Sequence, residues 1–274
     1  MKRPILTLCL LTAAFSSACQ LPGFDASPHV QVTAGIGHSS LGGNVAATDL
    51  DTVGDLVGST LDELGVGGRQ SIAQVGLKLT EGDTRWDFFA QSADFSGNGI
   101  LADDLTLEGV ELRFDEGEVS TDLQFGLYGF RWLKHVAKQG QLEVNLGASL
   151  VLADLDLEFE QQVADPVTGD LTGEVKSTGR EVLLPIPLPA LDLVFDHEAF
   201  DVHFLLSGMK VWSHDASGHV IDLDVSVSFP VLDDLGELVV GYRELELELE
   251  HSGAERAEVD VSLNGPYLAY RVSF

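Results

Sequence analysis

One short segment of the chain carries three residue types that work together in hydrolases. Asp201, His203 and Ser207 have the same parity, so they would lie on one face of a β-strand. Such a set can activate a serine nucleophile through a histidine base. No nucleophile motif surrounds Ser207, however. We therefore favour hydrogen-bonded polar groups inside the fold over a catalytic site, and a lipid-modifying enzyme is the alternative.

Carboxylates recur at alternate positions in two further segments. They are Asp154, Asp156, Glu158, Glu244, Glu246 and Glu248. Hard cations such as Ca²⁺ and Mg²⁺ prefer several oxygen ligands, so both rows are candidate metal ligands or a cation-attracting surface. The alternative is a polar network in which acids pair with Arg and Lys. No segment has the spacing of a compact calcium loop.

Three histidines fall between strand-like segments. His214, His219 and His251 lie there, with Asp215 close by, and imidazole with carboxylate can bind a transition metal. Histidines in loops are more often solvated, which is the interpretation we favour. The sequence has no phosphate loop, no cysteine metal site and no nucleotide-binding fingerprint, so no organic cofactor is expected.

The elements that carry these residues alternate apolar and polar side chains. Between Leu142 and Leu150, every even position is apolar and every odd position is Glu, Asn, Gly or Ser. The same period appears at 30–37, 74–79, 86–91, 122–127, 221–229 and 244–250. A period of two predicts β-strands with one apolar and one polar face. Pro185, Pro187 and Pro189 cannot donate to a ladder, which predicts an irregular or edge-like stretch there.

The connections between these strands alternate in length. Short ones are expected at 80–84, 137–141, 196–199 and 232–237, and longer ones at 38–70, 96–118, 160–180, 213–219 and 251–257. Counting gives about ten strands, with both chain ends on the side of the short turns. Short turns on one side and longer loops on the other are typical of membrane barrels. The predicted fold is all-β, an up-and-down antiparallel transmembrane β-barrel of about ten strands.

Two of the expected long loops contain local signals. In the first, apolar residues at helical spacing predict a short helix with an acidic opposite face, which would act as a local lid. They are Leu50, Val53, Leu56, Val57, Leu61 and Leu64. In the second, residues 105–114 predict a small hairpin that turns at Glu108-Gly109.

The last eight residues resemble the closing strand of bacterial outer-membrane β-barrels, where a terminal Phe is the usual ending. Tyr270, Val272 and Phe274 share the apolar face of this segment. The resemblance implies that these residues are the membrane-insertion signal and that the barrel-assembly machinery is a partner. It also implies that the lipid-facing side of each strand is the apolar one.

The whole chain resembles a family of Gram-negative outer-membrane barrel proteins that has no established activity. The matching motifs are Arg85-Trp86-Asp87-Phe88-Phe89, Asp94-Phe95-Ser96-Gly97, Leu184-Pro185-Ile186-Pro187-Leu188-Pro189, Gly241-Tyr242-Arg243 and Gly265-Pro266-Tyr267-Leu268. The resemblance rests on their order along the chain and implies an outer-membrane location, with membrane lipid and lipopolysaccharide as neighbours.

The N-terminus has the features of an export signal. Lys2 and Arg3 precede an apolar run over 5–15, which is far shorter than the ~20 residues of a membrane helix. Small residues then precede Cys19, and this stretch resembles the bacterial lipoprotein box, in which Cys19 is acylated. Ordinary cleavage after Ala18 is the alternative. We expect a signal peptide at 1–18 and a single barrel domain at 19–274.

The strongly acidic composition excludes one class of partner. The formal net charge is −29 at pH 7, whereas nucleic-acid binding needs basic patches. Ten strands also leave a narrow lumen, so a wide porin is not expected. The sequence predicts a non-enzymatic outer-membrane barrel that binds or passes small solutes or cations, or serves a structural or surface-binding role. A lipid-modifying barrel enzyme and a lipid-anchored soluble periplasmic β protein are the alternatives.

Overall fold

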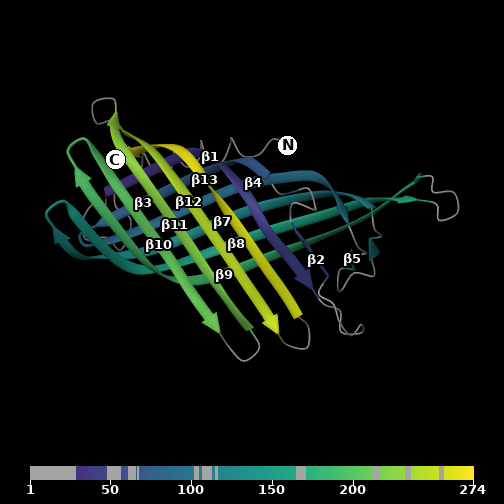
Figure 1. Cartoon of the computed structure of the whole chain (residues 1–274). Helices are drawn as coiled ribbons and strands as arrows, with labels where there is room; N and C mark the ends of the chain where they lie inside the picture. Colours follow the sequence, from purple (N-terminus) through teal and green to yellow (C-terminus); the bar gives the residue numbers. More distant parts are fainter. Residues whose placement is uncertain are drawn as a thin grey trace, which may run out of the picture.

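The computed structural model describes residues 29–47, 57–60, 66, 68–101, 105–106, 113–114, 117–164, 171–212, 216–231, 236–252 and 256–274. In this part of the chain, ten antiparallel strands form a barrel in which consecutive barrel strands are neighbours, and β13 pairs with β1 to close it (Figure 1). The barrel strands are β1 (His29–Ala47), β3 (Gly68–Glu81), β4 (Thr84–Leu101), β7 (Gly117–Gln139), β8 (Leu142–Ala164), β9 (Leu171–His197), β10 (Phe200–Trp212), β11 (Ala216–Val231), β12 (Gly236–Ser252) and β13 (Arg256–Ser273). The predicted ten-stranded, up-and-down barrel is confirmed. None of the described residues belongs to a helix that could cross a membrane.

Closure of the barrel reaches the last residue of the chain. The Phe274 N–H donates to the Val30 carbonyl at 2.8 Å, and the Val30 N–H donates to the Phe274 carbonyl at 3.3 Å. At the same end of the barrel, tight turns at Gly82 and Gly140 have φ of 56° and 61°, a region that favours glycine. The first described residue, His29, and Phe274 therefore lie on the side of the short turns, where the sequence predicts the start of the first strand and the end of the last.

The strands extend into segments that were expected to be loops. β1 also pairs with a short strand, β2 (Val57–Thr60), through Asn44–Ala47. Of the segment from Leu50 to Leu64 that is expected to be a helix, only 57–60 are described, and they form β2; the rest lies outside the described residues, so the helix stays a prediction. In the second loop, β5 (Leu105–Thr106) pairs with β6 (Arg113–Phe114), which confirms the hairpin stem, whereas its turn lies outside the described residues.

The outer face of the barrel carries an apolar belt next to the short turns. On β8 the outward side chains are apolar from Leu142 to Leu152, and Leu146 and Leu150 are 47% and 41% exposed. At ~3.3 Å per residue and a tilt of ~40°, this run spans about 25 Å, the height of the lipid-facing band of a membrane barrel. The outward aromatic side chains Tyr128, Phe130 and Trp132 on β7 belong to the same belt. The belt identifies the chain as a membrane-spanning barrel and rules out a soluble periplasmic protein.

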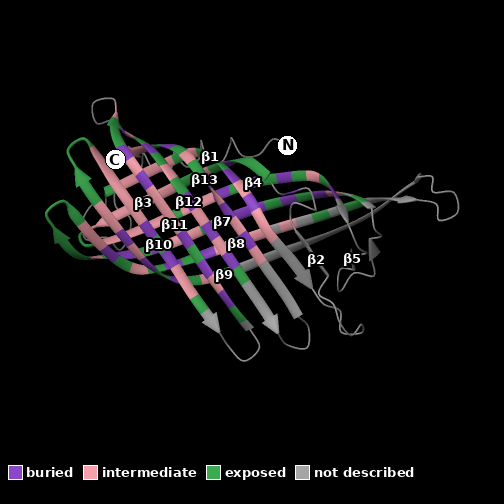
Figure 2. Cartoon of the chain, in the orientation of Figure 1, coloured by how far each residue is buried: buried purple, intermediate pink, exposed green. Residues whose placement is uncertain are grey.

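Beyond the belt, the polarity of the two faces is reversed. On β8 the inward residues Val151 and Ala153 are 0% and 2% exposed, while Asp154 and Asp156 face outward. β12 changes in the same way, with Leu245 and Leu247 buried inside. The expectation that the apolar face meets lipid along whole strands is therefore wrong for their outer halves. These halves lie above the lipid, so the apolar face turns inward as in a water-soluble β protein. Figure 2 shows the alternation of buried and exposed positions along the strands.

The wall of the barrel divides into two sheets above the belt. The β3–β4 ladder ends at Ala73–Ser92, and the β9–β10 ladder ends at Ala190–Ser207, although all four strands continue. Past these points, β4, β7, β8 and β9 form sheet A, and β10 to β13, β1 and β3 form sheet B. In Figure 1, β9 and β10 run apart toward the end opposite the short turns.

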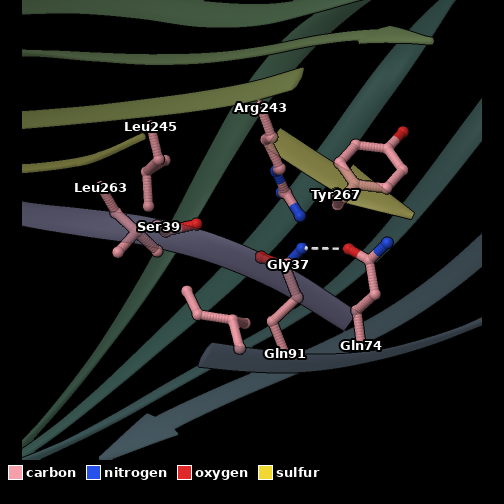
Figure 3. Close-up of a pocket in the computed structure, with 9 residues that line it drawn as sticks. Gly37, Ser39, Gln74, Gln91, Arg243, Leu245, Leu263 and Tyr267 are labelled. Carbon is pink, nitrogen blue, oxygen red and sulfur yellow. Dashed lines mark hydrogen bonds between the residues drawn. The ribbon is translucent and has the colours of Figure 1, made fainter. Parts of the chain in front are cut away.

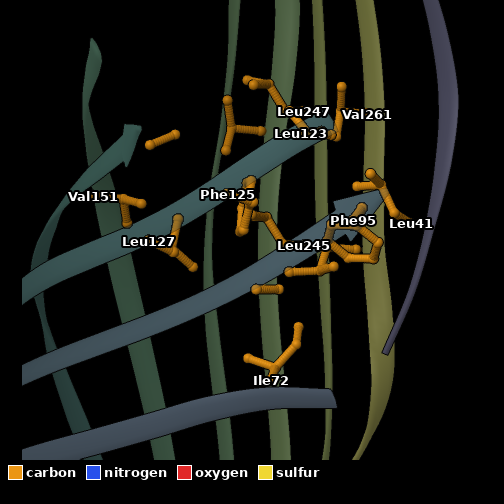
Figure 4. Packing of buried hydrophobic residues seen from close by; sticks show 14 of the residues in the cluster. Leu41, Ile72, Phe95, Leu123, Phe125, Leu127, Val151, Leu245, Leu247 and Val261 are labelled. Carbon is orange, nitrogen blue, oxygen red and sulfur yellow. The ribbon is translucent and has the colours of Figure 1, made fainter. Parts of the chain in front are cut away.

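One apolar core fills the space between the two sheets (Figure 4). Sheet A contributes Ala93, Phe95, Leu123, Phe125, Leu127, Val151, Ala153 and Leu188. Sheet B contributes Leu41, Ile72, Val220, Leu245, Leu247, Val261 and Leu263. The part of the barrel beyond the belt, on the side opposite the short turns, is thus packed like a β-sandwich.

Candidate functional site

A charged cluster crosses the lumen at the level of the belt. Asp222 on β11 is completely buried and accepts hydrogen bonds from Arg243 Nε at 2.8 Å and Arg243 Nη2 at 2.9 Å. Arg131 Nη2, from β7 on the opposite side of the barrel, donates to the same carboxylate at 2.9 Å. One carboxylate therefore ties together strands that are not neighbours in the sheet. Two arginines share it, and bidentate pairs of this kind are among the strong interactions of folded proteins.

An aromatic ring completes this cluster. The guanidinium carbons of Arg131 and Arg243 lie 4.1 and 4.6 Å from the centroid of the Phe89 ring on β4. Both distances are within the range of cation–π contacts. The neighbouring strand makes room for the ring, because a Cβ atom on Gly129 would overlap Phe89. A glycine on β7 therefore sets the position of a side chain on β4.

Further polar pairs fill the lumen on both sides of this cluster. Closer to the short turns, Asp192, which is 1% exposed, accepts from Arg85 Nη1 at 2.8 Å and from Asn145 Nδ2 at 2.9 Å. Elsewhere in the lumen, the Tyr267 hydroxyl donates to Asp224 at 2.8 Å. Other lumen pairs include Arg85 with Asp87 at 3.1 Å, and Gln91 with Gln74 and Arg271 with Glu237, each at 2.9 Å. In these pairs the acids bind Arg, Asn or Tyr, and none of them belongs to the carboxylate rows for which the sequence suggested such a network.

Little open space remains where the polar lumen meets the apolar core. A cavity of about 10 Å³ lies there, room for roughly one water molecule. Gln74, Gln91, Arg243 and Tyr267 line its polar side, and Leu245 is among its apolar lining residues (Figure 3). Around this cavity the described side chains form two layers across the barrel, one charged and one apolar.

The three residues considered for hydrolysis lie on the lumen face of β10 but do not form a catalytic set. Ser207 is fully buried next to Ala190 and Asp222 in the register. His203 and Ser207 are four residues apart on one strand, about 13 Å at ~3.3 Å per residue. A base must lie within ~3.2 Å of the proton it removes. The geometry places Asp201 and His203 close to each other along the strand and keeps both away from Ser207.

The two rows of carboxylates lie on the outer face of the sandwich beyond the belt. Asp154, Asp156 and Glu158 are on β8 in sheet A, and the other row, Glu244, Glu246 and Glu248, is on β12 in sheet B. The two rows are on different sheets, and neither row faces the lumen. No group of three His, Cys, Asp or Glu residues that could hold a metal ion occurs among the described residues. A role for Ca²⁺ or Mg²⁺ stays a prediction.

The remaining sequence candidates are placed as follows. His219 lies on the outer face, with Nδ1 at 3.2 Å from a Glu248 carboxylate oxygen. His214 and Asp215 lie outside the described residues, as do Cys19 and the expected signal peptide at 1–18. Tyr270 and Phe274 point outward, 36% and 72% exposed, on the same face as Val272.

The sequence motifs contained Phe89 and Arg243 of the cross-lumen cluster, but nothing in them showed that these residues meet. In Arg85-Trp86-Asp87-Phe88-Phe89, the odd positions point into the lumen, whereas Phe88 is exposed on the outside. In Gly241-Tyr242-Arg243, Arg243 binds Asp222, and the absence of a side chain on Gly241 leaves room for the Tyr267 ring. Asp222 was recognisable only as one polar position in an alternating strand.

The comparisons with known proteins agree on the fold. No protein-family model matches the chain, and no curated protein matches its sequence. Among solved structures, it is similar to the outer membrane protease OmpT of Escherichia coli, with a TM-score of 0.57 and 8% identity over 93% of this chain and 99% of that chain. The transport unit of the E. coli autotransporter AIDA-I matches with a TM-score of 0.41 and 9% identity over 97% of both chains. Neisserial surface protein A matches with a TM-score of 0.36 and 12% identity over 89% of this chain and 97% of that chain. The fold is that of the Gram-negative outer-membrane β-barrels, and at these identities the likeness concerns the fold alone.

Proposed function

We propose that this outer-membrane barrel is closed to solutes and works from its extracellular part, as a structural or surface-binding protein. The observation that carries the proposal is the Asp222 cluster, in which Arg131 and Arg243 reach one buried carboxylate from opposite sides of the barrel. Side chains that are hydrogen-bonded across a lumen cannot move aside for an ion without separating buried charges, which costs several kcal/mol.

The apolar core above this cluster supports the same proposal. An ion that passed the charged layer would next meet Phe95, Leu127 and Val151, which are at most 1% exposed. Moving an ion through such a layer is unfavourable because nothing there replaces its hydration shell. The belt then serves as the anchor, and the sandwich above it, with its polar outer face, is the part that can meet partners at the cell surface.

Conductance of the refolded protein in a planar lipid bilayer tests this proposal. We expect no steps from protein whose folding is verified by heat-modifiable gel mobility. A general porin added to the same bilayer afterwards would control for successful insertion. Reproducible cation-selective steps from the folded protein would instead assign a channel function and overturn the proposal.

A further inference from the structure

The barrel wall has a seam between β9 and β10. The two strands pair from Phe200–His197 to Ser207–Ala190 and no further. β9 nevertheless continues to Leu171 along β8, and β10 continues to Trp212 along β11. Within the described residues, no strand pairs with 208–212 on the side away from β11. The seam is therefore a separation of two strands that are each fully formed.

Three prolines explain why the ladder stops. A two-residue turn makes His197 and Phe200 a hydrogen-bonded pair, so odd residues of β9 direct their backbone groups toward β10. Pro185, Pro187 and Pro189 occupy consecutive positions of this kind, and proline has no N–H to donate.

A single proline elsewhere in the barrel has a smaller effect. At Pro266, the β1–β13 ladder is interrupted between Gly37–Tyr267 and Ser40–Asn264 and then resumes. The row of three prolines in β9 therefore removes three successive donors from the β9–β10 ladder, whereas one proline makes only a short gap.

The seam opens at the level of the membrane. Pro185, Pro187 and Pro189 are exposed on the outer face. In the register they lie beside Leu152, Leu150 and Ala148, the part of the apolar belt farthest from the short turns. The seam on the other side of the barrel starts at Ser92, where the outward residues are already polar. Only the β9–β10 seam therefore faces lipid, at the height of the outer leaflet.

The inward side chains behind the seam are apolar on both edges. Leu188 on β9 is buried, and Ile186 on β9 and Met209 on β10 are partly buried against the apolar core. Gly208 faces the seam without a side chain. An acyl chain fits such a lining, and because the core behind it is packed, the chain would lie in the wall of the barrel and not enter the lumen.

The polar groups at the seam indicate which polar groups the occupant carries in addition to an acyl chain. By the same register, the backbone groups of Gly208 and Lys210 point toward β9. In lipid, a backbone N–H without an acceptor costs several kcal/mol of free energy, so these N–H groups favour an occupant that carries acceptors. The Lys210 side chain is exposed beside the seam, opposite Pro187 when the register is extended, where its charge is within reach of a lipid phosphate. An ester carbonyl and a phosphate would meet these donors. We propose that the β9–β10 seam binds one phosphate-bearing lipid of the outer leaflet, with an acyl chain along the prolines and the phosphate at Lys210.

Native mass spectrometry tests the proposal directly. The full chain is refolded into vesicles of phosphatidylcholine with a minor fraction of phosphatidylglycerol, extracted in mild detergent and weighed with its bound lipid. We expect one retained phosphatidylglycerol per barrel. Replacing Pro187 and Pro189 by valine restores two donors and lets the ladder extend, so retention should fall about tenfold. Lys210→Gln should reduce the preference for phosphatidylglycerol over phosphatidylcholine, because it removes the charge and keeps the seam. Pro266→Val is the matched control and should retain lipid as the unaltered protein does.

Amide hydrogen exchange shows whether the valine variant has closed the seam. The Gly208 and Lys210 amides should exchange fast in lipid-free protein and slowly in the double variant. If the double variant shows slow exchange and still retains lipid at the original level, the site is not the seam. If the unaltered protein retains no phosphatidylglycerol, or forms dimers in its place, the proposal is also wrong, and dimers would assign the β10 edge to pairing between two copies.

Discussion

Arg243 holds the buried carboxylate of Asp222 with two hydrogen bonds, from Nε at 2.8 Å and from Nη2 at 2.9 Å. The two residues lie on adjacent strands, but the pair does more than join them. Arg131 reaches the same oxygen as Arg243 Nη2 from across the barrel. The carboxylate thus balances two buried positive charges, and its removal takes away the hydrogen-bonded partner of both.

Asp222→Ala is therefore expected to be strongly destabilising. Breaking a buried ion pair by removing one partner costs about 3–5 kcal/mol. Urea unfolding in detergent micelles, followed by tryptophan fluorescence, measures the change in the free energy of unfolding. Asp94→Ala, which removes an exposed carboxylate from the outer face of β4, is the control and should change stability little. A loss below about 1 kcal/mol in Asp222→Ala would mean that the arginines find other partners.

Gly129→Ala should disturb the same cluster by a steric route. The new Cβ would overlap the Phe89 ring, which lies within cation–π distance of two guanidinium groups. Overpacking of this kind costs about 1–3 kcal/mol. Phe89→Leu in the Gly129→Ala background should recover part of the loss, because the smaller side chain leaves room. Additive effects of the two changes in a double-mutant cycle would show that the glycine and the ring are independent.

The barrel itself was predictable because local patterns decide it. Period-two alternation, the placement of short turns and the closing strand at Tyr270–Phe274 each depend on neighbouring residues only. The prolines at 185–189 predicted an edge-like stretch for the same reason, and β9 lacks a partner on one side there. A local rule thus located the seam, although not its level in the membrane.

The polarity reversal and the lumen cluster could not be predicted from these patterns. Leu150 and Val151 are adjacent apolar residues on opposite faces of β8. Leu150 is 41% exposed on the outside and Val151 is fully buried inside, although the sequence pattern does not distinguish the two. A period of two says that two faces differ, but the medium on each side depends on height above the membrane. The meeting of Arg131 with Asp222 requires the barrel to close, which no short segment encodes.

Phe95→Ala tests whether the extracellular sandwich is a separate stability unit. Phe95 is 1% exposed in the apolar core above the belt, so its truncation should cost about 3–5 kcal/mol locally. We expect faster cleavage by an added protease in the extracellular part, with heat-modifiable mobility of the barrel retained. Phe88→Ala, on the lipid-facing side of the same strand, should leave cleavage unchanged. Loss of heat modifiability in Phe95→Ala would show that sandwich and anchor unfold together.

Glu158→Gln should stabilise the protein slightly. Glu158 on β8 lies directly opposite Asp122 on β7, and both are exposed on the outer face. Like charges opposite each other in a sheet are unfavourable, and removing one should gain about 0.2–1 kcal/mol. Divalent cations should produce a similar gain in the unaltered protein. Thermal unfolding with millimolar Mg²⁺ or with a chelator measures this. Glu198→Gln, at an exposed turn at the other end of the barrel, is the control. Equal midpoints with Mg²⁺ and with chelator would remove the predicted cation site.

Phe274→Ala should separate assembly from stability. The backbone of Phe274 makes two hydrogen bonds with Val30, which alanine would keep, while its side chain is 72% exposed and packs little against the barrel. Stability of the folded barrel should therefore change by less than about 1 kcal/mol. If the terminal aromatic residue is the membrane-insertion signal, the fraction of heat-modifiable protein in the outer membrane should still fall severalfold. Leu268→Ala, an exposed position on the same face, is the matched control. Equal assembly of the two variants would show that the terminal side chain has no special role, whereas a large loss of stability in Phe274→Ala would place that role in the folded barrel.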